Sequence, residues 1–189
     1  EFLRQNEFAT LVAYDGEKPT ASHLLMEVME DGEQLFINGH MSKANSLWKT
    51  FEKNAEVLVI FQGAHTYISP TWYNHVNVPT WNYQAVHVYG SPRIVTDHDE
   101  TYKLLSDLVL RNEGNSPYRL DGLPQDFVEK EINGVAGFAV DVMRIDAGYK
   151  LSQNRNDEDH ANIIRELEGR GDDDSKGVAR GMREKRNDG

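Results

Sequence analysis

The stretch "VPTWNYQAVHVYG", residues 78–90, decides the fold that we expect. It belongs to a strand over 81–95 whose apolar face is formed by Val86 and Val88, an alternation typical of a half-buried strand. Gly90, in the middle of this strand, indicates a bulge or a sharp bend of the kind with which barrels turn corners. A buried polar atom without a partner costs roughly 1–3 kcal/mol. The many polar side chains of this stretch therefore line either a polar cavity or a subunit interface.

Strand and helix patterns continue on both sides of this stretch. Hydrophobic alternation and turn residues predict strands at 8–14, 19–28, 35–37, 56–62 and 134–142, with an extended piece at 65–73 that is broken at Pro70. Helical spacing predicts helices at 44–51, 97–112, 124–133 and 157–168. We expect Ser42 to cap the first helix, and Asp97 and Glu100 to form a capping box at the second.

Many strands with helices between them, and no regular alternation of strand and helix, predict a mainly β or α+β fold. The expected architecture is an antiparallel barrel with inserted helices. The alternation at 134–142 predicts a half-buried strand.

We expect residues 1–150 to form the barrel domain and residues 151–189 to form a C-terminal helical segment with a polar tail. Residues from about 169 have almost nothing to bury, which predicts a peripheral helix or a disordered tail. The apolar stripe of the helix at 157–168 is His160, Ile163, Ile164 and Leu167.

Composition excludes several classes of function. Of the 189 residues, 39% are hydrophobic, which is enough for one sizeable core. The absence of cysteine excludes disulfides, thiolate nucleophiles and Cys-based zinc sites. The seven histidines are scattered without metal-ligand spacing, so we expect no metal. A formal net charge of −11 argues against a surface that generally binds nucleic acid.

The apolar runs of the chain are short. The longest, Val57–Phe61, is far below the roughly 18 residues of a membrane span, and no charged and apolar leader opens the chain. We therefore expect no membrane association and a cytoplasmic location. The chain begins with Glu1 and enters a strand pattern almost at once, so we expect native residues to precede it.

Two stretches carry candidate anion-binding residues. In "NGHMSKANSLW", residues 38–48, the N–H groups of a helix start together with Lys43 favour a phosphate, although an ordinary capped helix explains the same pattern. In "YKLSQNRND", residues 149–157, donor-rich side chains precede a helix. They bind an anionic or carbonyl-rich ligand, or they form a polar loop with Asn156 as the helix cap. These donors are Lys150, Gln153, Asn154 and Arg155.

Aromatic and polar side chains gather between residues 65 and 87, where His65, Tyr73 and His87 are candidate proton donors. Apolar walls with a few amide and hydroxyl groups suit a small flat ligand, but Trp and Tyr are also common at dimer interfaces.

The basic stretch "GVARGMREKR", residues 177–186, follows an acidic run and indicates a solvated terminal helix rather than a nucleic-acid patch.

Five segments together resemble one known family. In their order and spacing they resemble the PaiB family, described as FMN-binding split-barrel proteins and negative transcriptional regulators. The similarity extends from the start of the chain to about Leu167. The segments are "GHMSKANSLWKTF" (39–51), "HTYISPTWY" (65–73), "VPTWNYQAVHVYG" (78–90), "GVAGF" (134–138) and "YKLSQNRND" (149–157) with the "NII" that follows at 162–164.

The resemblance implies a split β-barrel related to the pyridoxine-phosphate-oxidase and flavin-reductase group, assembled as a homodimer with FMN at the subunit interface. It implies that Ser42 and Lys43 hold the FMN phosphate and that Gln84 approaches the flavin or its phosphate, with Trp81 to Tyr83 beside the pocket. The predicted cofactor-binding residues are Ser42, Lys43, Asn45, Trp81, Asn82, Tyr83, Gln84, Lys150, Gln153 and Arg155.

The resemblance also implies a role as a negative transcriptional regulator. DNA is a partner by family analogy alone, because the sequence shows neither a helix-turn-helix nor a basic face. The alternative is a flavin-dependent oxidoreductase of the pyridoxamine-oxidase or flavin-reductase type, in which the cofactor supplies the redox chemistry and no motif marks catalytic residues. A haem-binding protein ranks below both, because no histidine stands out as an axial ligand.

Overall fold

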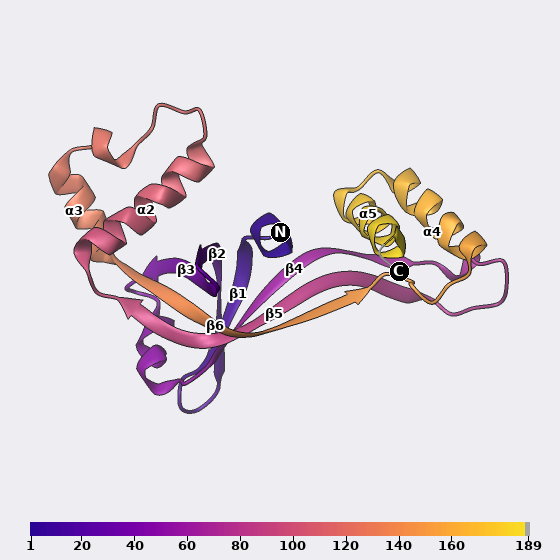
Figure 1. The fold of residues 1–189 in the computed structure, drawn as a ribbon, viewed down its shortest axis with the longest axis horizontal. Coiled ribbons are helices and arrows are strands. Elements are labelled where there is room, and N and C mark those ends of the chain that lie inside the picture. Colours follow the sequence, from indigo (N-terminus) through magenta and orange to yellow (C-terminus); the bar gives the residue numbers. More distant parts are fainter. Residues whose placement is uncertain (188–189) are drawn as a thin grey trace. The chain divides into compact units, whose positions relative to one another are not determined.

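The computed structural model describes residues 1–187, and Figure 1 shows its elements. The strands are β1 Phe8–Tyr14, β2 Pro19–Asp31, β3 Gln34–Ser42, β4 Val57–Ile68, β5 Thr80–Val95 and β6 Val135–Lys150. The α-helices are α1 Phe2–Gln5, α2 His98–Glu113, α3 Gln125–Gly134, α4 Asp157–Arg170 and α5 Asp173–Asn187. The 3₁₀ helices are η1 Ser46–Lys53, η2 Pro70–Trp72 and η3 Leu120–Gly122. Each predicted strand and helix has a counterpart here, and most are longer than predicted.

The strands close into a barrel in the order β1-β2-β3-β6-β5-β4. The pairs β1–β2, β1–β4, β2–β3 and β3–β6 are antiparallel. β1 to β3 form a meander, and its turns contain Gly16 and Gly32 at φ angles of 103° and 61° that favour glycine. β6 lies beside β3 although it comes much later in the chain, with Ile37 opposite Val140. The predicted antiparallel barrel is confirmed.

Contacts within the chain divide it into two compact units. The first unit comprises residues 1–61 and 87–145, and the second comprises residues 62–86 and those from 146 on. β4, β5 and β6 each contribute one part to the first unit and another part to the second. The domain boundary expected near residue 150 stays a prediction.

The core of the first unit lies between the barrel strands and η1. Leu11 of β1, Ile37 of β3 and Phe138 of β6 are fully buried. Phe138 contacts Phe51 of η1 edge to face, with ring centroids 5.5 Å apart. Aromatic pairs of this kind add roughly 0.5–1.5 kcal/mol beyond the area that they bury, so this contact fastens η1 to the barrel.

β6 is more deeply buried than its alternation predicts, and the expectation of a half-buried strand is wrong. Phe138, Ala139 and Val140 are all completely buried, so both faces of this part of the strand are covered. On the face opposite Phe138, a Cβ atom at Gly137 would lie 3.3 Å from Cβ of Val95 and near the Thr101 hydroxyl of α2. Packing of this kind depends on a distant helix, which an alternation rule does not detect.

Gly90 lets β5 and β6 approach closely. β5 runs unbroken from Thr80 to Val95. A Cβ atom at Gly90 would lie 2.3 Å from the backbone oxygen of Asp141 and 2.7 Å from Cγ1 of Val140. The glycine at the end of the 78–90 stretch is therefore needed for strand packing, where the sequence predicted a bulge or a bend.

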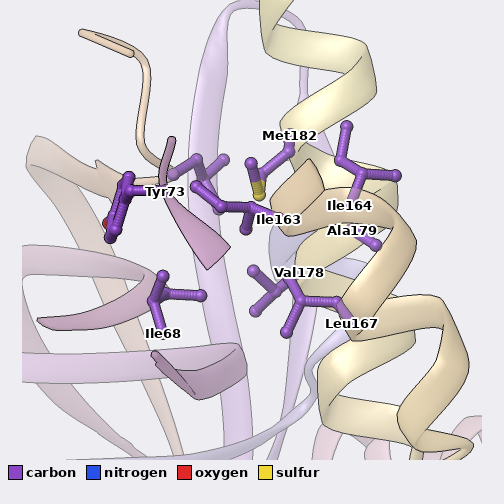
Figure 2. Close-up of a cluster of buried hydrophobic side chains, with 9 residues drawn as sticks. Ile68, Tyr73, Ile163, Ile164, Leu167, Val178, Ala179 and Met182 are labelled. Carbon is purple, nitrogen blue, oxygen red and sulfur yellow. The ribbon is translucent and has the colours of Figure 1, made fainter. Parts of the chain in front are cut away.

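The second unit has a hydrophobic core of its own, to which α4 and α5 both contribute (Figure 2). The stripe predicted for α4 is confirmed, because each of its residues is buried. A cap at Asn156 is also confirmed, since its side chain accepts a hydrogen bond from the Asp159 N–H. The core residues are Ile68, Tyr73, Leu151, Ile163, Ile164, Leu167, Val178, Ala179 and Met182.

α5 is a packed helix, so the expectation that residues after 169 have almost nothing to bury is wrong. Val178, Ala179 and Met182 are at most 1% exposed. A Cβ atom at Gly177 would lie 2.5 Å from Cβ of Ala64, so small residues let the helix lie directly on β4. A helix face that contains glycine can pack closely against a strand with only a few large apolar side chains. The polar composition of this segment therefore did not predict its burial.

Candidate functional site

The turn after β3 presents the first group of predicted residues. Ser42 ends β3, where it pairs with Val135 of β6, and the Lys43 N–H donates to the carbonyl oxygen of Gly134 at 2.9 Å. The indole N–H of Trp48 donates to the Lys43 carbonyl oxygen at 3.2 Å. These contacts hold the backbone of the turn, while the side chains of Ser42 and Lys43 are exposed.

The residue that caps η1 is Asn45, so the predicted cap at Ser42 is wrong. Oδ1 of Asn45 accepts from the Leu47 N–H at 3.0 Å, and Nδ2 donates to the Ser22 hydroxyl at 2.8 Å. The Ser42 hydroxyl instead accepts from the Ala44 N–H at 3.2 Å. The cap moves because η1 is a 3₁₀ helix that begins later than predicted. Both polar atoms of the Asn45 side chain are therefore engaged in hydrogen bonds within the protein.

Ser22 of β2 is a candidate that the sequence did not reveal. The Asn45 amide brings its hydroxyl to the turn after β3, and no sequence spacing predicts that contact. The ammonium group of Lys43 has no hydrogen-bond or ion-pair partner within residues 1–187. A free cation together with the hydroxyls of Ser22 and Ser42 is a donor set that suits a phosphate group.

In the second unit, Asn82 of β5 is completely buried and its amide is paired. Nδ2 donates to the Ser152 hydroxyl at 3.0 Å and contacts Met182 Sδ at 3.8 Å, and the hydroxyl donates to Oδ1 at 3.3 Å. Gln84 lies on the same face of β5, because a Cβ atom at Gly181 of α5 would lie 3.0 Å from its amide atoms. The most deeply buried polar atoms of the 78–90 stretch thus find partners inside the protein.

Trp81 and Tyr83 point to the opposite face of β5 and are 49% and 42% exposed. The indole N–H of Trp81 donates to Nδ1 of His65 at 3.3 Å, and its ring lies 6.4 Å from that of Tyr67 of β4. We call His65, Tyr67, Trp81 and Tyr83 the aromatic face. Its large, partly wetted rings are typical of surfaces that bind a partner or a ligand.

A cavity of about 370 Å³ lies between the loop before β5 and the loop after β6, and we call it the loop pocket. The Lys150 ammonium donates to the Thr80 hydroxyl at 2.6 Å. The Arg155 guanidinium lies over the Tyr73 ring, 4.8 Å from its centroid. The structure therefore gathers the predicted residues Asn82, Lys150, Gln153 and Arg155 in one place. The full lining is Val78, Pro79, Thr80, Asn82, Lys150, Ser152, Gln153, Asn154 and Arg155.

The candidate proton donors lie on different parts of the chain. His65 and Tyr73 belong to the second unit and His87 to the first. The buried Tyr73 hydroxyl and His40 Nδ1 have no hydrogen-bond partner among the described residues, and burial lowers the pKa of His40. Within residues 1–187 no three His, Asp or Glu side chains could together hold a metal ion. None of the helices in the same range combines the length and apolar character needed to cross a membrane.

Comparison with known proteins assigns the family. The family model "Putative FMN-binding domain" matches residues 1–144. "Protease synthase and sporulation protein PAI 2" of Bacillus subtilis is 40% identical over 186 residues, which cover 97% of this chain and 89% of that protein. The chain belongs to the PaiB family.

Solved structures resemble this PaiB-family chain in fold. The FAD and heme binding protein from Mycobacterium smegmatis has a TM-score of 0.57 at 15% identity, covering 85% of this chain and 74% of that protein. The flavocytochrome Anf3 from Azotobacter vinelandii has a TM-score of 0.55 at 16% identity, covering 85% and 72%. At such identities the likeness shows the fold alone, and it agrees with the predicted split barrel.

FMN is the cofactor of the PaiB family, and the turn after β3 fits it. The hydroxyls of Ser22 and Ser42 and the free ammonium group of Lys43 suit the phosphate of FMN. All three residues lie within the range that the family model matches, whereas Lys150 and Arg155 lie beyond it.

Proposed function

We propose that this chain is a homodimeric FMN-binding protein with a regulatory role, in which Ser42 and Lys43 hold the FMN phosphate. The observation that carries the proposal is the exposed side chain of Lys43, which follows Ser42 at the turn after β3 and whose ammonium group has no partner among the described residues. A hydrogen bond to a charged group contributes about 1.5–3 kcal/mol. The phosphate contacts alone therefore favour FMN strongly over a flavin that lacks the phosphate.

Each residue of the turn has a separate task. Lys43 neutralises the phosphate, Ser42 donates its hydroxyl, and Asn45 positions the Ser22 hydroxyl through the bond at 2.8 Å. FMN supplies redox chemistry that no side chain provides. The remaining residues of the predicted cofactor-binding set stay predictions.

Titration with FMN and with riboflavin, which lacks the phosphate, tests these contacts. Lys43→Ala should weaken FMN binding roughly 10-fold to 100-fold and leave riboflavin binding unchanged. Lys53→Ala is the matched control, because Lys53 is an exposed lysine in the last turn of η1. Equal FMN affinities for the two variants would show that Lys43 does not hold the phosphate.

The aromatic face supports assembly as a homodimer. Trp81 and Tyr83 leave large apolar rings exposed, and aromatic residues are enriched at the centres of protein interfaces. Trp81→Glu would place a charge in that surface and should shift the protein from dimer to monomer in light scattering. A wild-type chain that is monomeric at all concentrations would contradict this assembly.

A regulatory role is proposed from the family resemblance and from the likeness to PAI 2, whose name refers to protease synthase and to sporulation. Part of the positive charge of α5 is engaged, since Arg183 pairs with Glu168 and Arg186 with Asp157. We therefore favour regulation through a bound ligand over regulation through recognition of DNA by α5. Binding of DNA that weakens steeply with salt would indicate phosphate contacts and contradict this preference. The cytoplasmic location stays a prediction.

The flavin-dependent oxidoreductase also stays a prediction. Anaerobic addition of NADH or NADPH to the FMN-loaded protein distinguishes it. Bleaching of the flavin absorbance at a catalytic rate would favour the enzyme, and an unchanged spectrum would favour the binding protein.

A further inference from the structure

The loop pocket has no role in the FMN contacts proposed above. Its volume of about 370 Å³ falls within the roughly 300–1,000 Å³ typical of small-molecule sites. It is lined by residues of two segments, 78–82 and 150–155, both in the second unit. Residues far apart in the sequence thus enclose a space of the size of a small metabolite.

The pocket is positively charged in an acidic chain. The formal net charge of the chain is −11, yet the described lining contains Lys150 and Arg155 and no carboxylate. Within residues 1–187 the Arg155 guanidinium makes no hydrogen bond or ion pair, and it stacks on the Tyr73 ring. Lys150 uses one of its three N–H groups on the Thr80 hydroxyl. Donors of both cations therefore remain available for an anion.

One wall of the pocket is held rigid by hydrogen bonds. Oε1 of Gln153 accepts from the Leu151 N–H at 2.8 Å, and Nε2 donates to the Tyr149 carbonyl oxygen at 2.7 Å. Ser152 keeps a left-handed φ of 58° and is bonded to Asn82. Strained non-glycine residues of this kind cluster at binding sites.

The other side is braced by a buried carboxylate. Asp159, in the first turn of α4, is completely buried. Its Oδ1 accepts from the Asn74 N–H at 2.8 Å, and its Oδ2 accepts from the Asn156 amide at 2.9 Å. Nδ1 of His75 lies 3.3 Å from the same Oδ2. These contacts tie the loop before β5 to the start of α4, so less entropy is lost when a ligand enters the pocket.

We propose that the loop pocket binds a small organic anion, whose carboxylate or phosphate group is held by Arg155 and Lys150. The guanidinium fork can bond two oxygens of such a group, and the exposed amide of Asn154 offers a further donor. The apolar part of the anion lies against Val78 and Pro79. The inference does not rest on the FMN contacts proposed for Ser42 and Lys43, because neither residue lines the loop pocket.

Ligand-observed NMR on the full chain tests the proposal with three probes that share a ring. The probes are benzoate, phenyl phosphate and uncharged benzyl alcohol. The wild-type chain binds at least one of the two anions and not the alcohol, and the tighter anion identifies the group as carboxylate or phosphate. Arg155→Gln weakens that binding at least tenfold. Arg165→Gln leaves it unchanged, because Arg165 is an exposed residue of α4 outside the pocket lining.

Lys150→Met is a second variant that retains the stacking of Arg155 on Tyr73, and it should also weaken anion binding. The proposal is overturned when the wild-type chain binds neither anion, when benzyl alcohol binds as tightly as the anions, or when the variants at 155 and 165 have equal affinities. FMN titration separates this site from the FMN site. Because the sequence also predicted Arg155 as an FMN-binding residue, Arg155→Gln is titrated with FMN as well. An FMN affinity equal to that of the wild type supports a separate site, and a loss as large as that of Lys43→Ala would make the pocket part of the FMN site and overturn the proposal.

Discussion

Replacing Gly90 by alanine tests the closest approach between two strands of the barrel. The added Cβ would lie 2.3 Å from the Asp141 backbone oxygen and 2.7 Å from Val140 Cγ1, whereas real Cβ contacts essentially never fall below 3.0 Å. The oxygen belongs to the backbone of β6, so relief requires two neighbouring strands to separate. Overpacking typically costs 1–3 kcal/mol. We expect Gly90→Ala to lower the free energy of unfolding by about 3 kcal/mol, the upper end, because a strand moves less readily than a side chain.

Urea and thermal unfolding measure this loss. A change of 1 kcal/mol shifts Tm by about 2–4 °C in a chain of this length, so Gly90→Ala should lower Tm by roughly 6–12 °C. Gly122→Ala is the matched control, because a Cβ atom there meets nothing within 4 Å. Gly39→Ala should fall between the two, since its Cβ would meet side-chain atoms of Phe138 and Met26. Equal urea midpoints for the variants at 90 and 122 would refute the reasoning.

Three further predictions concern other contacts. Ser152→Ala leaves the buried Asn82 amide without its partner and should lower the free energy of unfolding by roughly 1–3 kcal/mol; an unchanged urea midpoint would contradict the pairing. Gly177→Ala places a Cβ 2.5 Å from β4 and should speed amide exchange along α5; unchanged protection would show that the helix adapts. A hydrogen bond with Glu129 raises the pKa of His98 above 6.5, so this pair stabilises the fold below about pH 6.5 and the contribution is lost as pH rises through the folded pKa. NMR titration should show a lower His98 pKa in Glu129→Gln, and an unchanged pKa would exclude Glu129 as the cause.

The sequence predicted helix caps and turns correctly where residues a few positions apart decide them. Asp97 caps α2 by accepting from the Glu100 N–H at 2.8 Å, at the position that the capping box indicates. The turn between β1 and β2 has Gly16 at a positive φ, as a turn residue there requires. Such features depend on neighbours within a few residues, so the sequence carries all the information needed.

The same rules failed where a distant segment supplies the packing. The cap at Ser42 was displaced to Asn45, whose amide is bonded to Ser22 of another strand. α5 is buried through Gly177 and a few apolar residues, because β4 lies directly beneath it. β6 is covered on both faces over residues 136–140. In each case burial follows from which elements become neighbours, and not from periodicity.

The sequence by itself determined the antiparallel strand class, the helix at 157–168 with its buried stripe, and membership of an FMN-binding family through motifs that keep their order. Only the tertiary structure decided that residues 78–82 and 150–155 enclose one pocket. It also decided that Asn82 is bonded inside the protein while Trp81 is exposed. The reason is physical: helix and strand periods arise within a few residues, whereas a cavity depends on the order in which strands close the barrel.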